Sequence, residues 1–352
     1  MNREQAKEIL DIFLAKQRVS WYKPIQIAEI LYKKRVAPES LDLLNLETYR
    51  TQSKKWRDEI SRKLVGSVST SSAKFQDDVF NANAIPPEVL SILGAENIRT
   101  NGAVEAYIYN KFFERRSQLT TALSYANEHS KDSFSLREFI DLFWLEPGLK
   151  RSLDKIYEIV VYALFSTLTY ELGVQVELSV GDDKMDLLNE FSDFAKGVML
   201  LDPSSMIHIE EARIYRVGVT NAADRGLDMY ANWGPAIQVK HLALDEELAK
   251  SVVESISSDR IVIVCKSAEQ GVIVSLLTQI GWKSKIQSVI TEDNLVEWYE
   301  KALKGRFANQ LGNYLLANLR EGILEEFPQL EESNSSVLSE RHYENIVDNY
   351  WK

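Results

Sequence analysis

The sequence has 352 residues, 45% of them hydrophobic, a composition typical of a folded globular protein with two or three domains. Its single cysteine, Cys265, excludes an internal disulfide framework and a cysteine-based zinc site. No apolar stretch is long enough to cross a bilayer, and the first residues do not resemble a signal peptide. The expected location is therefore the reducing cytoplasm.

The charge is distributed unevenly along the sequence. The net charge is −11, yet residues 1–75 contain 15 Lys and Arg against 9 Asp and Glu, which gives this segment +6 and leaves −17 for the remainder. A local basic region can bind nucleic acid even in an acidic protein. Chance variation of surface charge explains the same distribution, so both interpretations stay open.

Residues 1–90 are expected to form a mostly helical, winged-helix-like domain. Helices are predicted at residues 4–16, 23–35 and 46–64, and the polar segment 67–80 is predicted to form a hairpin. The third helix would lie in the major groove of DNA. The basic side chains that it would present to DNA are Arg50, Lys54, Lys55 and Arg57. An ordinary solvated helix is the competing interpretation.

The rest of the sequence changes character twice. The segment Ala84-Ile-Pro-Pro breaks the chain, and residues 91–150 are predicted to be a helical connector, with a second recognition element as the alternative. From about residue 151, helical and strand patterns alternate: a helix at 156–172 closes at Gly173, and the apolar run 261–265 is typical of a buried strand. This order predicts an α/β domain over residues 151–305, with a mixed central sheet flanked by helices. Residues 306–352 are predicted to be a helical tail.

The most informative stretch is residues 224–241, which read D-R-G-L-D-M-Y-A-N-W-G-P-A-I-Q-V-K-H. A Gly-Pro turn in this stretch predicts two antiparallel strands that bring Asp228 to Gln238. Gln238 and Lys240 are two positions apart on one strand and are expected to share a face. Asp224 is the alternative candidate for the acid of this site. Asp228 is preferred because it lies nearer to the Gly-Pro turn and continues the strand register.

These side chains suit the hydrolysis of a phosphodiester with Mg²⁺ as cofactor. Mg²⁺ prefers oxygen ligands and needs only one or two carboxylates. Asp228, the amide oxygen of Gln238 and the carbonyl of Val239 are the predicted metal ligands, and Lys240 is expected to orient the attacking water. Glu158, the only charged residue between Ile156 and Tyr170, is a candidate second carboxylate. The alternative interpretation is that the Glu158 side chain simply lies at the solvent edge.

Other motifs carry less weight. His208 and His241 have no metal-binding spacing, and His241 is expected to face away from Lys240. No phosphate-binding loop of the form G-x-x-x-x-G-K-[ST] is present, so no nucleotide cofactor is expected. Cys265 is predicted to be a small core residue.

At these residues the sequence resembles known nuclease families. The blocks G-L-D and I-Q-V-K-H, with the helix Y-E-I-V-V-Y-A-L-F, resemble Mrr-type domains of the PD-(D/E)xK nuclease superfamily, in the variant with glutamine for the second acid. A long insertion separates that helix, with Glu158, from Asp228. The whole chain, and residues 214–244 above all, resembles the HaeII family of type II restriction endonucleases. That resemblance implies Mg²⁺-dependent cleavage of double-stranded DNA at a palindrome with a GCGC core, by a homodimer. A non-catalytic DNA-binding regulator or initiator and a structure-specific repair nuclease are the alternatives.

Overall fold

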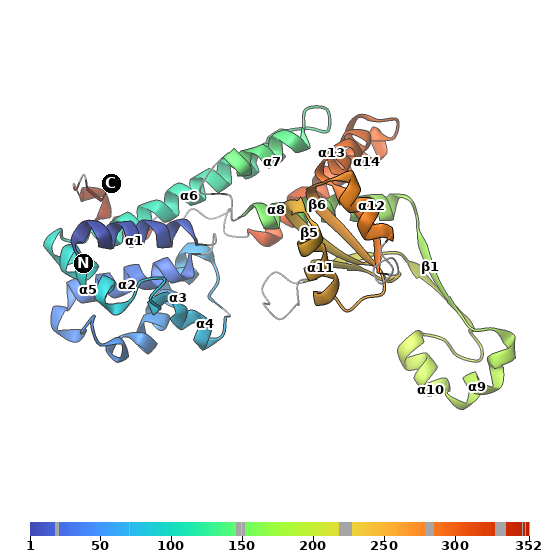
Figure 1. Cartoon of the computed structure of the whole chain (residues 1–352), viewed down its shortest axis with the longest axis horizontal. Helices are drawn as coiled ribbons and strands as arrows, with labels where there is room; N and C mark the ends of the chain where they lie inside the picture. Colours follow the sequence, from blue (N-terminus) through green and yellow to red (C-terminus); the bar gives the residue numbers. More distant parts are fainter. Residues whose placement is uncertain are drawn as a thin grey trace. The chain divides into compact units, whose positions relative to one another are not determined.

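The computed structural model describes residues 1–17, 21–69, 71–145, 149, 152–217, 227–278, 285–327, 336–346, 348, 350 and 351. They form two compact units (Figure 1). Unit 1 consists of Met1–Asn127, Phe139–Leu153 and Ile323–Lys352, and unit 2 of Glu128–Glu138 and Asp154–Gly322. The boundary predicted near residue 90 does not coincide with this division, because the chain continues within unit 1 to Asn127.

Unit 1 is helical throughout its described residues. Its helices are α1 (Arg3–Ala15), α2 (Tyr22–Val36), α3 (Arg50–Val65), α4 (Ala73–Asp77), α5 (Pro87–Arg99), α6 (Ala103–Glu128), α7 (Leu136–Leu145) and α15 (Ser336–Glu340). Buried apolar side chains from the N-terminal helices form one core, which Val337, Tyr343 and Trp351 of the C-terminal segment join. Arg341 pairs with the buried Glu29 at 2.6 Å. The final part of the predicted tail is therefore an integral part of unit 1.

The hairpin predicted at residues 67–80 is wrong. Its second half forms α4 and a 3-10 turn over Asp78–Phe80. The Ser72 hydroxyl accepts a hydrogen bond from the Phe75 N–H at 3.4 Å, as a helix N-cap does. Val79 and Phe80 are both buried, whereas a strand would place neighbouring side chains on opposite faces. Without that hairpin, the described part of unit 1 lacks the wing of a winged helix.

Unit 2 is built on a five-stranded mixed sheet, as predicted. The strands, in spatial order, are β3 (Ile214–Arg216), β4 (Met229–Ala231), β5 (Ala236–Leu244), β6 (Ile261–Ala268) and β7 (Ile286–Thr291). The first three strands are antiparallel, and β5, β6 and β7 are parallel. The flanking helices are α8 (Leu153–Glu171), α11 (Glu246–Ser255), α12 (Gln270–Thr278), α13 (Glu292–Lys304) and α14 (Ala308–Glu326). Cys265 lies fully buried on β6, in the core position predicted for it.

A two-stranded ribbon leaves this sheet (Figure 1). Its strands β1 (Gln175–Ser179) and β2 (Ile207–Glu211) pair antiparallel. The connection carries α9 (Met185–Glu190), α10 (Ser192–Phe194) and a π-helical turn over Ala195–Met199. The alternating residues 174–180 predict a strand, which β1 confirms, whereas no sequence pattern indicated β2. The amphipathic residues 185–199 predict a single helix, where the structure has three short ones. Residues 174–212 are called the arm below. None of the described helices has the length and apolar character needed to cross a membrane.

Candidate active site

The hairpin of β4 and β5 brings together the two ends of the predicted motif. Gly234 occupies its turn with φ of +114°, a region that favours glycine. The antiparallel register pairs Met229 with Ile237. Asp228 and Gln238 each lie one position further from the turn, so they face each other across the strands as predicted.

Asp228 is a partly buried carboxylate held by two donors. The Gln238 side-chain amide donates a hydrogen bond to Oδ2, and the Val239 N–H donates to the same oxygen at 2.7 Å. Burial, and after it the negative charge of Glu158, raises the pKa of Asp228 to about 6, against the opposing effects of the Val239 hydrogen bond and of Lys240. A partly buried carboxyl group whose ionisation a neighbouring acid opposes is a favourable place for a cation.

Glu158 reaches this place from helix α8 and is 9% exposed. Lys155, one turn earlier, donates to both of its carboxylate oxygens, at 2.9 and 2.7 Å. Two tyrosine hydroxyls hold α8 in position. Tyr157 of α8 donates a hydrogen bond to the carbonyl of Cys265 on β6 at 3.4 Å. Tyr299 of α13 donates a hydrogen bond to the carbonyl of Val160 on α8 at 2.8 Å. The helix that carries Glu158 is thus fixed to the sheet and to α13.

Lys240 lies close enough to the carboxylates of Asp228 and Asp154 for its charge to lower the pKa of each. Asp154, four residues before Glu158 on α8, forms an ion pair with Nδ1 of His241. Burial alone would raise the pKa of Asp154, but the hydrogen bond and charge of His241, with the lysines, hold it below its ordinary value. Three charged side chains, Lys155 and Glu158 of α8 and Lys240 of β5, therefore act on Asp228.

His241 contacts Asp154 of α8, and the charge of Lys240 lowers the pKa of the same carboxyl group. That His241 and Lys240 face opposite sides of the strand stays a prediction. The register of β5 against β6 shifts between Lys240 and Ala243. Strict alternation of side chains requires a regular pleat, and it fails where the register slips. The sequence does not signal this irregularity.

The residues present fit a divalent cation. Gln238 is 1% exposed, and its Oε1 accepts no hydrogen bond. A buried acceptor without a donor is costly, and a cation beside the Asp228 and Glu158 carboxylates would satisfy it. No group of three or more His, Cys, Asp or Glu among the described residues is placed to hold a metal. A metal here would therefore rely on the amide oxygen in addition to the two carboxylates.

Comparison with known proteins identifies the family of the whole chain. A model of the HaeII restriction endonuclease family matches residues 6–343. The chain belongs to that family. It is 56% identical over 344 residues to the type II restriction enzyme HaeII of Haemophilus aegyptius, covering 97% of each chain. It is also 57% identical over 334 residues to the type II restriction enzyme NgoBI of Neisseria gonorrhoeae, covering 95% of this chain and 94% of the relative. No solved structure matches the chain.

Membership of the HaeII family confirms the resemblance found in the sequence, and it confirms that the chain is an enzyme of the restriction endonuclease class. The structure confirms that Asp228, Gln238, Lys240 and Glu158 come together in space. The catalytic role of each side chain stays a prediction.

The four basic residues predicted to contact DNA lie in three different environments. Arg57 is 1% exposed and donates to Asp58 and Gln26, so its expected position on an exposed face is wrong. Arg50 and Lys54 both pair with Asp77 of α4, at 2.9 and 2.6 Å. Lys55 is exposed. DNA contact by Arg50, Lys54 and Lys55 stays a prediction.

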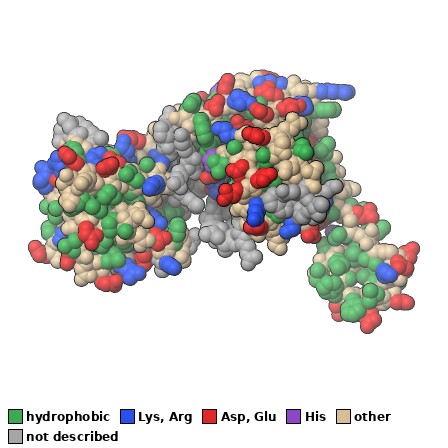
Figure 2. Space-filling model, viewed as in Figure 1, with side chains coloured by type: hydrophobic (Ala, Val, Ile, Leu, Met, Phe, Trp, Pro, Cys, Tyr) green, Lys and Arg blue, Asp and Glu red, His purple; other side chains and the backbone are tan. Residues whose placement is uncertain are grey.

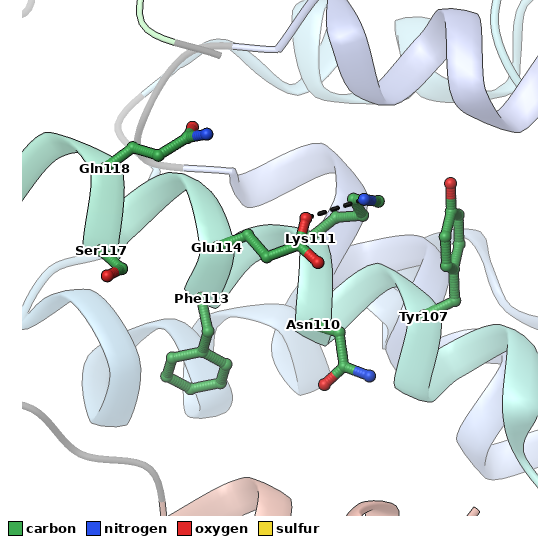
Figure 3. Close-up of a pocket in the computed structure, with 7 residues that line it drawn as sticks. All are labelled: Tyr107, Asn110, Lys111, Phe113, Glu114, Ser117 and Gln118. Carbon is green, nitrogen blue, oxygen red and sulfur yellow. Dashed lines mark hydrogen bonds and ion pairs between the residues drawn. The ribbon is translucent and has the colours of Figure 1, made fainter. Parts of the chain in front are cut away.

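Unit 1 also has an open pocket of about 670 Å³ along α6 (Figure 3). Its lining residues are Tyr107, Asn110, Lys111, Phe113, Glu114, Ser117 and Gln118. Within it, Lys111 and Glu114 form an exposed ion pair at 2.7 Å, so their opposite charges largely offset each other. None of the residues predicted from the sequence to cut or contact DNA lines this pocket.

Sequence reasoning missed Asp154 and Lys155, and it did not indicate the contact between His241 and Asp154. One signal was available for Asp154: it precedes Glu158 by four residues, a spacing that puts both acids on one face of a helix. The prediction considered only the apolar part of that helix, from Ile156 onward. The competing acid Asp224 lies outside the described residues.

Proposed function

We propose that this member of the HaeII family hydrolyses phosphodiester bonds in double-stranded DNA at a specific sequence, with Mg²⁺ as cofactor. The observation that carries the proposal is the Asp228 carboxylate, whose pKa burial and Glu158 raise to about 6, beside the unpaired amide oxygen of Gln238 and the ammonium of Lys240. Family membership supports the reaction class, since the two curated relatives are type II restriction enzymes.

Each side chain has a defined part in this proposal. Both hydrogen bonds to Asp228 fall on Oδ2, so we assign Oδ1 to the metal, with the Gln238 amide oxygen and the Val239 carbonyl as further ligands. When bound, Mg²⁺ supplies positive charge at the scissile phosphate and makes a water more acidic. Lys240 directs its ammonium at the phosphate oxygens and orients the attacking water. Lys155 holds the Glu158 carboxylate in place through two hydrogen bonds.

The mixed sheet, the preceding helix with Glu158, and the hairpin with Asp228, Gln238 and Lys240 support a PD-(D/E)xK core in unit 2, in the variant with glutamine for the second acid. We assign contact with DNA to α3 in unit 1, through Arg50, Lys54 and Lys55. The recognised site would be a palindrome with a GCGC core, and the enzyme would act on it as a homodimer.

Cleavage of unmethylated plasmid DNA tests the proposal. The purified protein should yield discrete fragments with Mg²⁺ and none with EDTA. Lys240→Ala should lower the cleavage rate by at least about 100-fold and leave specific binding to DNA intact. Lys250→Ala, which removes an exposed lysine of α11, is the matched control and should cut like the wild type.

Each contrary result identifies a different alternative. Binding without cleavage in any divalent metal would favour a DNA-binding regulator. Cleavage confined to branched or damaged DNA would favour a repair nuclease. Fragments that end at sites without a GCGC core would refute the proposed recognition sequence alone.

A further inference from the structure

A contact between helix α8 and strand β5 lies directly beside the candidate catalytic lysine. Nδ1 of His241 and the carboxylate of Asp154 form an ion pair, and His241 follows Lys240 in the chain. The His241 side chain is 20% exposed and the Asp154 side chain 58% exposed, so the imidazole is enclosed and the acid reaches it from the surface. Neither side chain has a part in the proposed chemistry.

The sheet stops supporting β5 regularly just after Lys240. The register of β5 against β6 is regular up to Lys240, then shifts, and pairing resumes only at Ala243. In these described strands, His241 and Leu242 have no register partner on β6. On the other edge of β5, pairing with β4 reaches only Ile237. A strand that loses its regular ladder bends locally, so the backbone beside Lys240 needs another support.

Asp154 offers a fixed point for that backbone. It lies in the first turn of α8, four residues before Glu158. The hydroxyls of Tyr157 and Tyr299 hold α8 to β6 and to α13. The contact with His241 therefore attaches an irregular part of β5 to a helix whose position is set by other interactions. Attachment to a rigid element narrows the positions that a neighbouring functional side chain can take.

The charge of Asp154 also acts on the Lys240 side chain. The ammonium of Lys240 lowers the pKa of Asp154 and of Asp228, so it lies within electrostatic reach of both carboxyl groups. A lysine side chain is flexible and adopts many positions unless its neighbours restrict it. Asp154 thus restricts Lys240 in two ways: through its charge, and through the His241 contact that holds the next residue of the backbone.

We propose that the contact between Asp154 and His241 positions Lys240 for cleavage, a step that rests on the proposed function. Asp154 and His241 are positioning residues, which act on the scissile phosphate only through Lys240. The contact does not require a charged imidazole, because Nδ1 carries a hydrogen in the imidazolium and in one of the two neutral tautomers. The carboxylate accepts that hydrogen in either state.

The kinetics of plasmid cleavage by full-length variants test this role. Asp154→Ala and His241→Ala should each lower kcat by about 10- to 100-fold, the effect of a small displacement of a reacting group. The KM for DNA and the Mg²⁺ concentration for half-maximal rate should stay within about threefold of the wild-type values, because neither side chain is a proposed ligand. An unchanged kcat, or a loss confined to KM, would overturn the proposal.

A double-mutant cycle shows whether the two side chains act as one unit. The double variant Asp154→Ala, His241→Ala should cut no more slowly than the slower single variant, because both substitutions break the same contact. Losses that multiply would mean independent roles and would contradict the proposal.

A conservative variant tests the contact itself. His241→Asn should restore most of kcat, since the asparagine amide nitrogen lies near the place of Nδ1 and can donate to Asp154. An asparagine variant as slow as His241→Ala would exclude the contact as the cause of the loss.

Two similar pairs elsewhere in unit 2 provide matched controls. Nε2 of His208 lies 3.9 Å from the Glu210 carboxylate on the arm, and Figure 2 shows the arm as a lobe that extends away from the rest of unit 2. Glu171, at the other end of α8, accepts a hydrogen bond from Gln310 at 2.6 Å. His208→Ala and Glu171→Ala should keep the wild-type kcat. Equal losses in these controls would show a general disturbance and refute the positioning role.

Amide hydrogen exchange separates this inference from the proposed function, because it needs no DNA. Exchange over residues 240–242 should be at least about tenfold faster in Asp154→Ala and His241→Ala than in the wild type. The midpoint of thermal unfolding should shift by no more than about 3 °C, since a partly exposed pair contributes little to global stability. A wild type that cuts no DNA would refute the proposed function. A wild type that cuts DNA, beside variants with unchanged exchange, would refute the attachment of β5 alone.

Discussion

Replacing Asp228 with asparagine should stabilise the metal-free protein while abolishing cleavage. Asparagine has nearly the shape of aspartate, and its side-chain oxygen can still accept the hydrogen bond that the Val239 N–H donates at 2.7 Å. It cannot ionise, so it removes the cost of holding a carboxylate in a partly dry place beside Glu158. Stability and activity are therefore expected to change in opposite directions.

The size of the effect follows from the pKa of Asp228, raised from 3.8 to about 6. At about 1.4 kcal/mol per pKa unit, ionisation of this group costs the folded protein up to about 3 kcal/mol. Because the folded-state value is the higher one, the stability from this group is present below pH 3.8 and is lost as the pH rises through about 6. The advantage of Asp228→Asn should thus be full at pH 8 and roughly half as large at pH 5.

Urea unfolding in EDTA, followed by tryptophan fluorescence at pH 5 and pH 8, measures this difference. Glu325→Gln is the matched control: Glu325 is an exposed acid of α14, and its substitution should change stability little at either pH. A variant less stable than the wild type at pH 8, or a difference that does not depend on pH, would refute the account of the Asp228 environment. Mg²⁺ should stabilise the wild type more than Asp228→Asn.

Three further predictions concern single side chains. Gln238→Ala should reduce cleavage by about 100-fold and raise the Mg²⁺ concentration for half-maximal rate, because it removes the proposed amide ligand; unchanged metal dependence would contradict that role. Arg57→Ala should lower the unfolding free energy by about 2–4 kcal/mol, because the buried Gln26 side chain loses the donor to its oxygen, whereas Lys55→Ala should only weaken DNA binding and its salt dependence. Burial raises the pKa of Cys265 to about 11, so a thiol reagent at pH 8 should label it only after unfolding.

Local patterns in the sequence were sufficient for most regular elements of unit 2. Gly173 ends α8 with positive φ, as predicted. The sequence also predicts Asp245 as the N-cap of a helix, and Asp245 caps α11 through a hydrogen bond from the Leu248 N–H at 2.8 Å. The Gly-Pro turn and strand parity were sufficient to bring Asp228 to Gln238. These features depend on a few adjacent residues, so the sequence determines them directly.

The failures arose where a distant segment or an irregularity decides the outcome. The segment 67–80 alternates like a hairpin, yet Val79 and Phe80 are buried together and Asp77 pairs with Lys54 of α3. Arg57 looks exposed on a helical projection, but the α2 side chain Gln26 accepts from it inside the core. Both outcomes depend on which helix packs against α3, and the periodicity of apolar residues in the sequence does not indicate that neighbour.

The sequence by itself determined the family, the mixed α/β unit and the acid, amide and lysine of the candidate site, because each depends on residue identity and short-range spacing. Tertiary structure alone decided the electrostatics of that site. It placed α8 so that Glu158 raises the pKa of Asp228, and it brought His241 of β5 into contact with Asp154. Charge interactions act through space between segments distant in the chain, so only the packed fold determines them.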